Sequence, residues 1–410
     1  MNWIKLLSTA GALAAVSFAG TAHAEDVITL GAAVSITGKY STNGKNTKDG
    51  YDLAVERVNS MGGVKVGDKT YKLEIKYYDD ESTPARGAQL VERLINQDGV
   101  KLMLGPYSSG LTKAVAPVTE KYKIPQVEAN GADRGLFTEG YKYLFAVLST
   151  SDYYLREAVN LAAEQAKAAG KDPADVKIAI AIENDPFSQD VRLGVIEDAK
   201  KHGMDIVIDD RLPPELNDMT ATLTKVKALK PDLLVVSAHA KGPPLALRQM
   251  SEMKVNVPML AMTHCDSADI IGKFEKLSEY ALCATQWDAS LSYEDKWFGK
   301  ASDFAEDFEK AYDYFPPYQA AESAAAVLVY ADALERAGSL DSETVRDALA
   351  ETDMMTFYGA VKFDETGKNT AKPMVLWQVQ DGAYKVVAPA KYADSELIYP
   401  IPTWDERGGS

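Results

Sequence analysis

The sequence has 410 residues and a formal net charge of −16, with 46% hydrophobic residues. At roughly 100–200 residues per domain, this length predicts two domains that each bury a core of their own. The acidic balance makes nucleic acid and anionic lipid poor partners, because their phosphates would be repelled, whereas a local pocket can still hold a small organic anion.

Residues 1–24 predict a cleaved secretory signal peptide. They contain a lysine, an apolar stretch and the sequence Ala22-His23-Ala24, an order that is typical of export signals. Serine, threonine and glycine interrupt the apolar stretch, which is shorter than the roughly 20 residues of a membrane span. We therefore expect a periplasmic protein that starts at Glu25 and does not insert into the membrane.

Strands and helices alternate along the first part of the chain. The pattern predicts strands at 27–35, 71–80, 100–106 and 124–129, and helices at 47–61, 84–97 and 111–122. Strands separated by helices of this length indicate right-handed β-α-β units and a parallel sheet.

A second alternation begins at Tyr153. It predicts helices at 153–170, 188–203, 219–230 and 242–253, and strands at 176–185, 204–212, 231–239, 257–264 and 280–287. Two aromatic or alanine-rich helical segments, 297–315 and 320–338, and a smaller α/β end follow. No Ser/Gly- or Pro-rich linker separates the two sets, so the sequence predicts an α/β protein with two Rossmann-like lobes joined by short crossings.

Polar and glycine-containing segments follow most of the predicted strands. Ligands of open α/β sheets bind at the carboxyl ends of the strands, so these segments are the candidate binding regions. They are Ser35–Gly44, Asp79–Ser82, Tyr107–Gly110, Glu128–Gly131, Asn184–Ser188, Ser237–Lys241 and Thr263–Asp266. Their composition favours a cleft that binds one small polar solute.

Two serines, Ser108 and Ser109, precede the helix predicted at 111–122. One interpretation is a helix N-cap, in which a hydroxyl accepts a backbone hydrogen bond and stabilises the helix by about 0.5–2 kcal/mol. The other is a carboxylate site, because a helix N-terminus offers free N–H groups and the positive end of the helix dipole. Both hold at once if one serine caps the helix and the other binds a ligand.

Motifs of common enzymes do not occur in the sequence. The stretch 38–46 differs from the phosphate loop G-x-x-x-x-G-K-[ST], because five residues separate its glycines and Asn46 replaces the required hydroxyl. No G-x-G-x-x-G fingerprint opens a helix, and no G-x-S-x-G or Ser-His-Asp arrangement is present. We therefore expect neither an enzyme nor a cofactor.

His239 and His264 each end a strand predicted for the second lobe. Each is either a buried structural residue or part of a binding site. A metal site at His264, Cys265 and Asp266 is disfavoured, because adjacent side chains of an extended chain point to opposite faces. Cys265 and Cys283 are compatible with one disulfide in an oxidising compartment, and equally with two buried thiols.

Several stretches together resemble a known family. They are ITLGAAVSITGKYSTNG near the start, AVERVNSMGGV, KYYDDESTPARGAQLVERLI, LGPYSSGLTKAVAPV and VKFDETGK. In this order they are similar to the substrate-binding component of branched-chain amino acid-type ABC importers, which are type I periplasmic binding proteins. The resemblance covers the chain after the signal peptide.

The resemblance implies two lobes that are joined by three crossover strands and close on one ligand. The first lobe would comprise residues 25–148 and 287–377, and the second residues 149–286 and 378–410. It also implies a membrane permease as partner, and we expect a monomer.

The resemblance further implies where the ligand binds. Ser109 matches the position that holds the ligand carboxylate, with Ser108 beside it. After the next strand, Asn130 stands where the family usually has a hydroxyl, and Glu128 is unusual there. An aromatic residue that covers the ligand matches Phe187.

In the second lobe, His264 matches the position at which amino acid binders use an acid to hold the ammonium, and Asp266 lies nearby. His239 matches another contact. The resemblance also implies contacts from the first lobe. Tyr40 and Asn43 lie in the first loop, Tyr107 follows the strand predicted at 100–106, and Tyr318 lies on a first-lobe helix.

Asn130 and His264 thus differ from the residues that the family's amino acid binders have at these positions. The differences favour a carboxylate ligand other than an amino acid, preferably an aromatic acid. A branched-chain or other amino acid, or an amide, comes second. Imidazoles can donate to a hydroxyl, a carbonyl or a second carboxylate, and a free histidine titrates near pH 6.5. Affinity for an anionic group at these rings is therefore expected to rise from about pH 8 to about pH 6. An exported sensor that uses the same cleft is the alternative to a transport protein.

Overall fold

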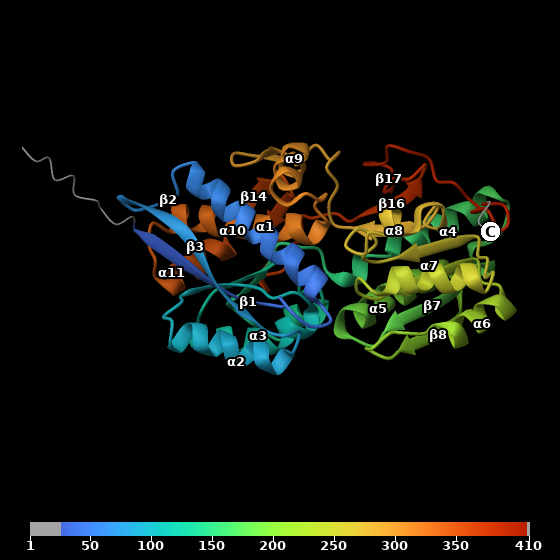
Figure 1. Ribbon diagram of the computed structural model, residues 1–410, viewed down its shortest axis with the longest axis horizontal. Coiled ribbons are helices and arrows are strands. Elements are labelled where there is room, and N and C mark those ends of the chain that lie inside the picture. The colour runs from blue at the N-terminus through green and yellow to red at the C-terminus, as the bar shows by residue number, and fades with distance from the viewer. Residues whose placement is uncertain (1–25, 408–410) are drawn as a thin grey trace, which may run out of the picture.

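The computed structural model describes residues 26–407, which form two lobes side by side (Figure 1). The predicted signal peptide, residues 1–24, lies outside the described residues. Within residues 26–407, none of the helices combines the length and the apolar character that crossing a membrane requires.

The first lobe is built on a six-stranded sheet with the order β2-β3-β1-β4-β5-β6. All neighbouring pairs are parallel except the hairpin of β2 and β3. The strands are β1 (Val27–Val34), β2 (Val64–Val66), β3 (Lys69–Asp79), β4 (Leu102–Leu104), β5 (Gln126–Glu128) and β6 (Leu144–Ala146). The parallel sheet predicted from the β-α-β alternation is confirmed.

Among the described residues, α-helices, a short 3-10 helix (Arg134–Thr138) and two small hairpins complete the first lobe. The helices are α1 (Ser41–Ser60), α2 (Pro84–Asn96), α3 (Ser109–Tyr122), α9 (Ala301–Tyr312), α10 (Tyr318–Ala337) and α11 (Ser342–Ala350). The hairpins pair β12 (Glu294–Asp295) with β13 (Gly299–Lys300), and β14 (Asp353–Thr356) with β15 (Gly359–Lys362). The alanine-rich α10 is buried along most of its length against α1. A Cβ atom at Gly50 would lie 2.1 Å from the Ala320 carbonyl oxygen, so this close helix contact requires glycine.

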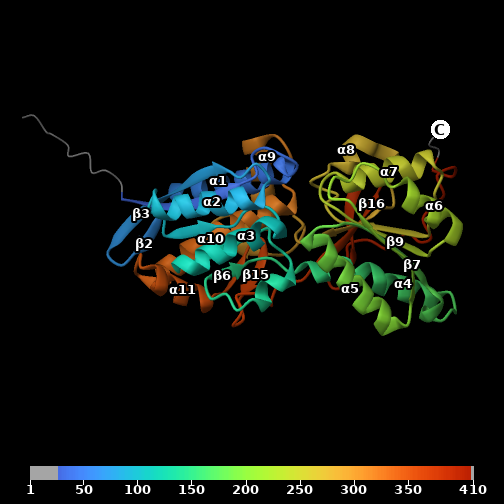
Figure 2. The same cartoon turned by 90° about the horizontal axis from the view of Figure 1, so that it is seen from below.

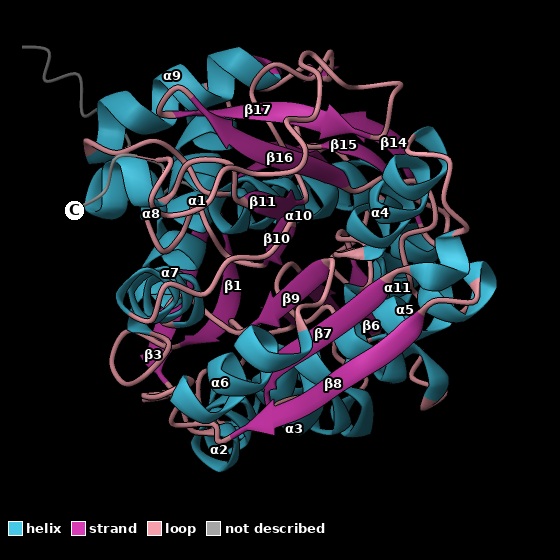
Figure 3. Ribbon diagram, turned by 90° about the vertical axis from the view of Figure 1, so that its right-hand side faces the viewer, coloured by secondary structure: helices cyan, strands magenta, loops and turns pink. Residues whose placement is uncertain are grey.

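The second lobe has a seven-stranded sheet with the order β17-β16-β11-β10-β9-β7-β8. The strands are β7 (Lys177–Glu183), β8 (Asp205–Leu212), β9 (Leu233–Ser237), β10 (Met259–Met262), β11 (Leu282–Thr285), β16 (Val375–Gln380) and β17 (Ala383–Ala388). Figure 3 looks onto this lobe from its outer end, with β8, β7 and β9 side by side. The interior strand β9 is buried at every residue, as expected for a parallel strand covered on both faces.

Helices cover both faces of the second sheet. α4 (Arg156–Ala168) and α5 (Pro186–His202) lie on one side, and α6 (Thr220–Leu229), α7 (Gly242–Glu252) and α8 (Ile270–Phe274) on the other (Figure 2). The strands β7, β9, β10 and β11 all run parallel, so their carboxyl ends meet at one edge of the sheet. This edge faces the first lobe, and it positions the candidate site.

The chain crosses between the lobes three times, after β6, after β11 and before β16, as the predicted architecture requires. The three crossing segments are hydrogen-bonded to one another but are not strands of either sheet. Ser149 and Gln286 exchange bonds of 3.1 and 2.9 Å, and the Ser149 hydroxyl donates to the Lys372 carbonyl at 2.5 Å. The Lys372 ammonium in turn donates to the Gln286 carbonyl, so one small network joins all three crossings.

Two predicted boundaries differ from the structure. The expected end of the first lobe at 377 falls inside β16, which pairs with β11 in the second sheet. The first helix begins at Ser41 instead of 47, because a short turn through Gly38 at φ +88° leads from β1 directly into α1. Asn43 therefore lies in the first turn of α1 and not in a loop.

Candidate functional site

A small enclosed cavity lies between the lobes, where the carboxyl ends of both sheets meet. Its volume is about 10 Å³, which is close to the space that one water molecule needs. It is lined by Tyr107, Ser108, Ser109, Asn130, Tyr154, Phe187, His239, His264, Tyr318, Gln319 and Glu322. The structure thus brings eight of the predicted site residues together from both lobes.

Aromatic rings form most of the cavity wall. Tyr154 meets Phe187 edge-to-face with ring centroids 5.0 Å apart, and Tyr318 lies 6.1 Å from Tyr154. Phe187 also packs edge-to-face on His264 at 5.1 Å. Such edge-to-face geometry is the favourable arrangement for aromatic pairs. A planar ligand ring would fit among these rings only after they move apart, because the cavity has the volume of about one water molecule.

The Tyr107 hydroxyl of the first lobe lies between two imidazoles of the second. It is 2.7 Å from His239 Nδ1 and 3.0 Å from His264 Nε2. A phenolic hydroxyl has one proton, so it donates to one ring and accepts from the other. The imidazole pair therefore offers one acceptor and one donor to a hydroxyl between them.

His264 follows β10 in a left-handed backbone conformation, with φ +59°. Its pKa is lowered well below the ordinary value of 6.5, chiefly because the ring is fully buried and also because His239 lies beside it. The ring is therefore neutral at physiological pH in this closed arrangement. Burial thus argues against the expectation that acidification strengthens anion binding through His264, because it opposes the protonated form.

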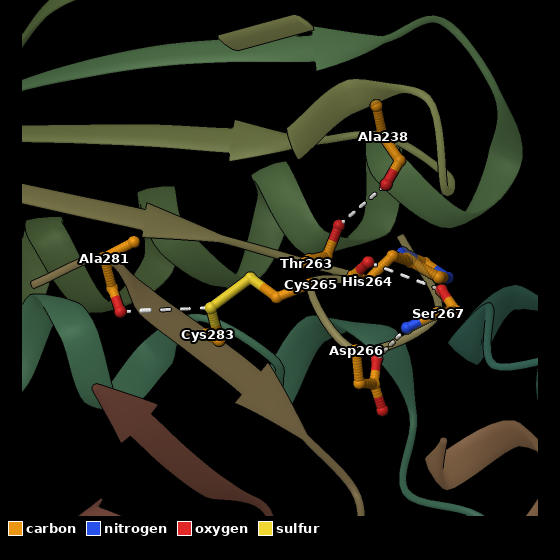
Figure 4. Close-up of a disulfide and its surroundings, with 8 residues drawn as sticks. All are labelled: Ala238, Thr263, His264, Cys265, Asp266, Ser267, Ala281 and Cys283. Carbon is orange, nitrogen blue, oxygen red and sulfur yellow. Dashed lines mark hydrogen bonds between the residues drawn. A yellow bond between two sulfur atoms is a disulfide. The ribbon is translucent and has the colours of Figure 1, made fainter. Parts of the chain in front are cut away.

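A disulfide anchors the segment that carries His264. Cys265 is bonded to Cys283, which joins the loop after β10 to the neighbouring strand β11 (Figure 4). Both half-cystines are fully buried. Of the two alternatives left open by the sequence, the structure has the disulfide.

Ser108 and Ser109 divide the two expected roles at the start of α3. Ser108 is the N-cap, with its hydroxyl 3.5 Å from the Leu111 N–H and a strained backbone at φ +104°. Ser109 is the first helical residue, and its hydroxyl oxygen accepts a hydrogen bond from the Asp133 N–H at 3.0 Å. The Ser109 hydroxyl keeps its own proton for donation at the positive end of the helix.

Glu128 and Asn130 have different roles. The Glu128 carboxylate turns away from the cavity and accepts the N–H groups of Asn130 at 2.6 Å and Gly131 at 2.7 Å, besides the Thr112 hydroxyl at 2.9 Å. Its burial raises its pKa to about 7, although these bonds favour the ionised form. Asn130 lines the cavity and donates to Ser323 Oγ at 3.0 Å.

Three further predicted residues do not line the cavity. The Asp266 carboxylate accepts the backbone N–H of Ser267 at 2.8 Å and of Tyr318 at 3.0 Å, so it caps the start of α10 across the lobe boundary. Tyr40 packs behind the cavity, edge-on to His239 at 4.7 Å. Asn43 is buried within α1. The Asp266 carboxylate and the Tyr40 ring thus make contacts within the fold at the cavity margin, whereas the Asn43 amide nitrogen is buried and has no hydrogen-bond partner within residues 26–407.

Residues 27–383 match the family model described as periplasmic binding protein. The chain belongs to this family. The predicted resemblance to branched-chain amino acid-type ABC substrate-binding proteins is confirmed, and the protein is a solute-binding protein rather than an enzyme.

Similar proteins span nearly the whole chain. A Leu/Ile/Val-binding protein homolog 7 of Brucella suis biovar 1 (strain 1330) is 24% identical over 401 residues, which are 94% of this chain and 97% of the relative. The structure of LivJ, a branched-chain amino acid transporter substrate-binding protein of Streptococcus pneumoniae in complex with isoleucine, gives a TM-score of 0.76 at 21% identity, covering 89% of this chain and 100% of LivJ. A solute-binding protein of Rhodopseudomonas palustris BisB5 in complex with 3,4-dihydroxybenzoic acid gives a TM-score of 0.77 at 19% identity, covering 92% and 99%.

The periplasmic binding protein has three cavity residues that the sequence analysis did not identify, Tyr154, Gln319 and Glu322. Glu322 stands one helical turn after Tyr318, so the i, i+4 spacing on α10 would have indicated it. Gln319 follows Tyr318 directly. Tyr154 comes from the first crossing segment, where its hydroxyl accepts from Gln286 at 2.9 Å, and no sequence signal distinguishes it from the adjacent Tyr153.

Unpaired polar atoms gather at the same cavity. Within the described part of the chain, the Asn130 Oδ1, both amide atoms of Gln319 and the His264 Nδ1 are buried and have no hydrogen-bond partner. Buried polar atoms in native proteins are nearly always paired, so such a cluster indicates a place where a ligand completes the hydrogen bonds. Glu322 accepts from the Tyr358 hydroxyl at 3.2 Å, and burial raises its pKa well above the ordinary range.

The buried His264 predicts a pH dependence of ligand binding. If opening exposes the ring to solvent, its pKa returns to the ordinary value near 6.5, so that below this pH the open form would gain a proton that closure must release. Affinity is therefore expected to fall by up to about tenfold between about pH 6.5 and about pH 5.5, and His264→Gln is expected to flatten this change.

Calorimetric titrations of both proteins across this range measure the effect. The other titrating groups of the cavity, including Glu322, are common to both proteins, so the difference between them isolates His264. An affinity that rises on acidification, with the same slope in both proteins, would show that His264 does not change its protonation on closure.

Proposed function

We propose that this protein is the periplasmic solute-binding component of an ABC importer and that its two lobes close on one aromatic carboxylate. The observation that carries this proposal is the aromatic cavity wall with its imidazole pair, which already binds the phenolic hydroxyl of Tyr107. A ligand hydroxyl that displaces the Tyr107 hydroxyl would meet the same acceptor and donor, whereas a carbonyl or second carboxylate would use only the donor. A membrane permease would then receive the ligand from the closed protein.

The first lobe supports the carboxylate end of the proposed ligand. The start of α3 offers the Ser109 hydroxyl proton and first-turn N–H groups that have no partner inside a helix. The Gln319 amide nitrogen adds an unpaired donor at the cavity, whereas the unpaired atom of Asn130 is its acceptor oxygen. The strained conformation of Ser108 is typical of a binding site.

The available acids favour an aromatic acid over an amino acid. An ammonium needs a free carboxylate, but those of Glu128 and Asp266 already accept hydrogen bonds from backbone N–H groups. Glu322 lines the cavity, yet burial favours its protonated form. A neutral carboxylic acid is a weaker partner for an ammonium than an ionised one.

An amino acid ligand is the second candidate. The Brucella relative is named a Leu/Ile/Val-binding protein and LivJ was solved with isoleucine, whereas the Rhodopseudomonas structure holds 3,4-dihydroxybenzoic acid. Glu322 is the observation that favours this candidate, because an ammonium beside it would stabilise the ionised form. A third possibility is that the protein is an exported sensor that binds its ligand in the same cleft.

A thermal-shift screen tests the proposed ligand class. The panel contains benzoate, 4-hydroxybenzoate, 3,4-dihydroxybenzoate, leucine, isoleucine and an aliphatic dicarboxylate. A ligand present at 100 times its Kd adds about 2.7 kcal/mol to the stability of the folded form, so a hydroxybenzoate is expected to raise the melting temperature most. A rise with the branched-chain amino acids alone would favour the second candidate.

A further inference from the structure

His239, one ring of the imidazole pair, meets two further side chains with metal-ligand chemistry in the second lobe. Glu183 ends β7, Asp185 is the N-cap of α5, and His239 follows β9. One carboxylate oxygen or ring nitrogen from each lies within 4.8 Å of the others. The three residues are 5%, 8% and 6% exposed, so these groups are held inside the protein instead of extending into solvent.

Two atoms of this cluster lack a partner among the described residues. They are Asp185 Oδ2 and His239 Nε2. Asp185 uses its other oxygen, Oδ1, to accept the Ser188 N–H at 3.2 Å as the helix cap. The His239 ring is held by the Tyr107 hydroxyl at Nδ1, which leaves Nε2 aimed at the carboxylates, 3.4 Å from Asp185 Oδ1. His239 Nε2 thus faces the Asp185 carboxylate inside the cluster without a hydrogen bond of good geometry.

A lysine of the first lobe forms an ion pair with this cluster. Lys39 Nζ lies 3.2 Å from Glu183 Oε1 and 4.5 Å from the centroid of the Tyr40 ring. It is the cationic side chain that pairs with the cluster in the closed arrangement. Because Lys39 and the cluster belong to different lobes, opening would remove this counter-charge from Glu183 and leave its carboxylate available to another cation.

We propose that Glu183, Asp185 and His239 form a binding site for a divalent transition-metal ion of the Zn²⁺ class. One imidazole nitrogen and two carboxylates are a donor set that Zn²⁺ accepts, with the fourth position left for water. Mg²⁺ and Ca²⁺ prefer oxygen ligands alone. Tetrahedral bonds of about 2.0–2.1 Å place ligand atoms roughly 3.4 Å apart, a spacing that Asp185 and His239 already have, and rotation of the Glu183 carboxylate completes the set.

The metal site goes beyond the binding of an organic solute and does not depend on which solute binds. Coordination at His239 Nε2 leaves the proton on Nδ1, so the ring donates to whatever lies between the two imidazoles. Lys39 and the ion compete for Glu183. Zn²⁺ affinity is therefore expected to fall in Glu183→Gln and to rise in Lys39→Met. These opposite changes separate metal binding from general damage to the fold.

The test uses the tag-free mature protein, stripped of metal with a chelator and titrated with Zn²⁺ in competition with a chromophoric chelator. We expect one ion per chain at micromolar affinity or better. Glu183→Gln and Asp185→Asn are each expected to weaken Zn²⁺ binding at least tenfold. Lys39→Met is expected to strengthen it, and Glu215→Gln, at an exposed carboxylate of the same lobe, is the control that leaves it unchanged.

Three outcomes would overturn the proposal. They are no 1:1 binding of Zn²⁺ to the wild type, an affinity that Glu183→Gln and Asp185→Asn leave unchanged, and a Lys39→Met variant that binds more weakly than the wild type. A variant that misfolds cannot gain affinity, so the strengthening by Lys39→Met keeps the test decisive. If no aromatic acid raises the melting temperature in the thermal-shift screen, the proposed solute class is refuted. The outcome of the Zn²⁺ titration is independent of that screen.

Discussion

Replacing Cys265 and Cys283 together by alanine is expected to lower the free energy of unfolding by about 3 kcal/mol. The disulfide closes a loop with a sequence separation of 18 residues, and loop-closure entropy predicts about 3 kcal/mol for a loop of roughly this size. Denaturant unfolding of the oxidised wild type and the double variant measures the difference. Affinity is expected to fall as well, because Cys265 is adjacent to His264.

Reduced wild type is the matched control for this double variant. It keeps both buried sulfur atoms but lacks the covalent link, so it separates the crosslink from the loss of packed volume. A similar loss in reduced wild type and in the variant is expected. If the double variant unfolds at the same denaturant concentration as the oxidised wild type, the disulfide does not anchor the loop that carries His264.

Ser109→Ala is expected to weaken binding of an aromatic carboxylate by about 1.5–3 kcal/mol, the range for hydrogen bonds to charged groups. The hydroxyl also accepts the Asp133 N–H, so the unliganded protein is expected to lose about 1 kcal/mol of stability. Calorimetric titration and denaturant unfolding of the same preparation measure the two effects. The loss in binding is expected to be the larger.

Thr119→Val is a matched control at the other end of α3. It removes a buried hydroxyl that bonds to Gln126 at 3.0 Å, and Thr119 lies outside the cavity lining. It is expected to cost stability but to leave affinity unchanged. Should Ser109→Ala behave in the same way, Ser109 only anchors the segment at Asp133 and the carboxylate is bound elsewhere.

The alternation of strands and helices predicted the two sheets and the edge at which the site lies. Because polar segments after parallel strands converge in space, residues as distant as Ser109, Phe187 and His264 could be assigned to one cleft from the sequence. The family resemblance, in the same way, indicated that Tyr318 on α10 reaches this cleft.

The direction of each polar side chain could not be predicted. Glu128 ends β5 and Asp266 follows β10, as residues that line the cavity also do. Both carboxylates nevertheless turn to backbone N–H groups, because the loops beside them leave buried donors that need acceptors. Tyr154 enters the cavity through a crossing segment whose path depends on contacts with Gln286. Such contacts form between distant parts of the chain, and local sequence does not specify them.

Isothermal titration calorimetry of the wild type with 3,4-dihydroxybenzoate and with isoleucine, in one buffer at about pH 7.5, is the most direct measurement of the proposed function. At this pH His264 is neutral in both forms, so closure releases no proton from it. A cavity of aromatic rings, an imidazole pair and a helix N-terminus predicts 1:1 binding of the dihydroxybenzoate, at least tenfold tighter than that of isoleucine. Tight binding of isoleucine with no heat from the aromatic acid would contradict the proposal and would assign the ammonium to Glu322.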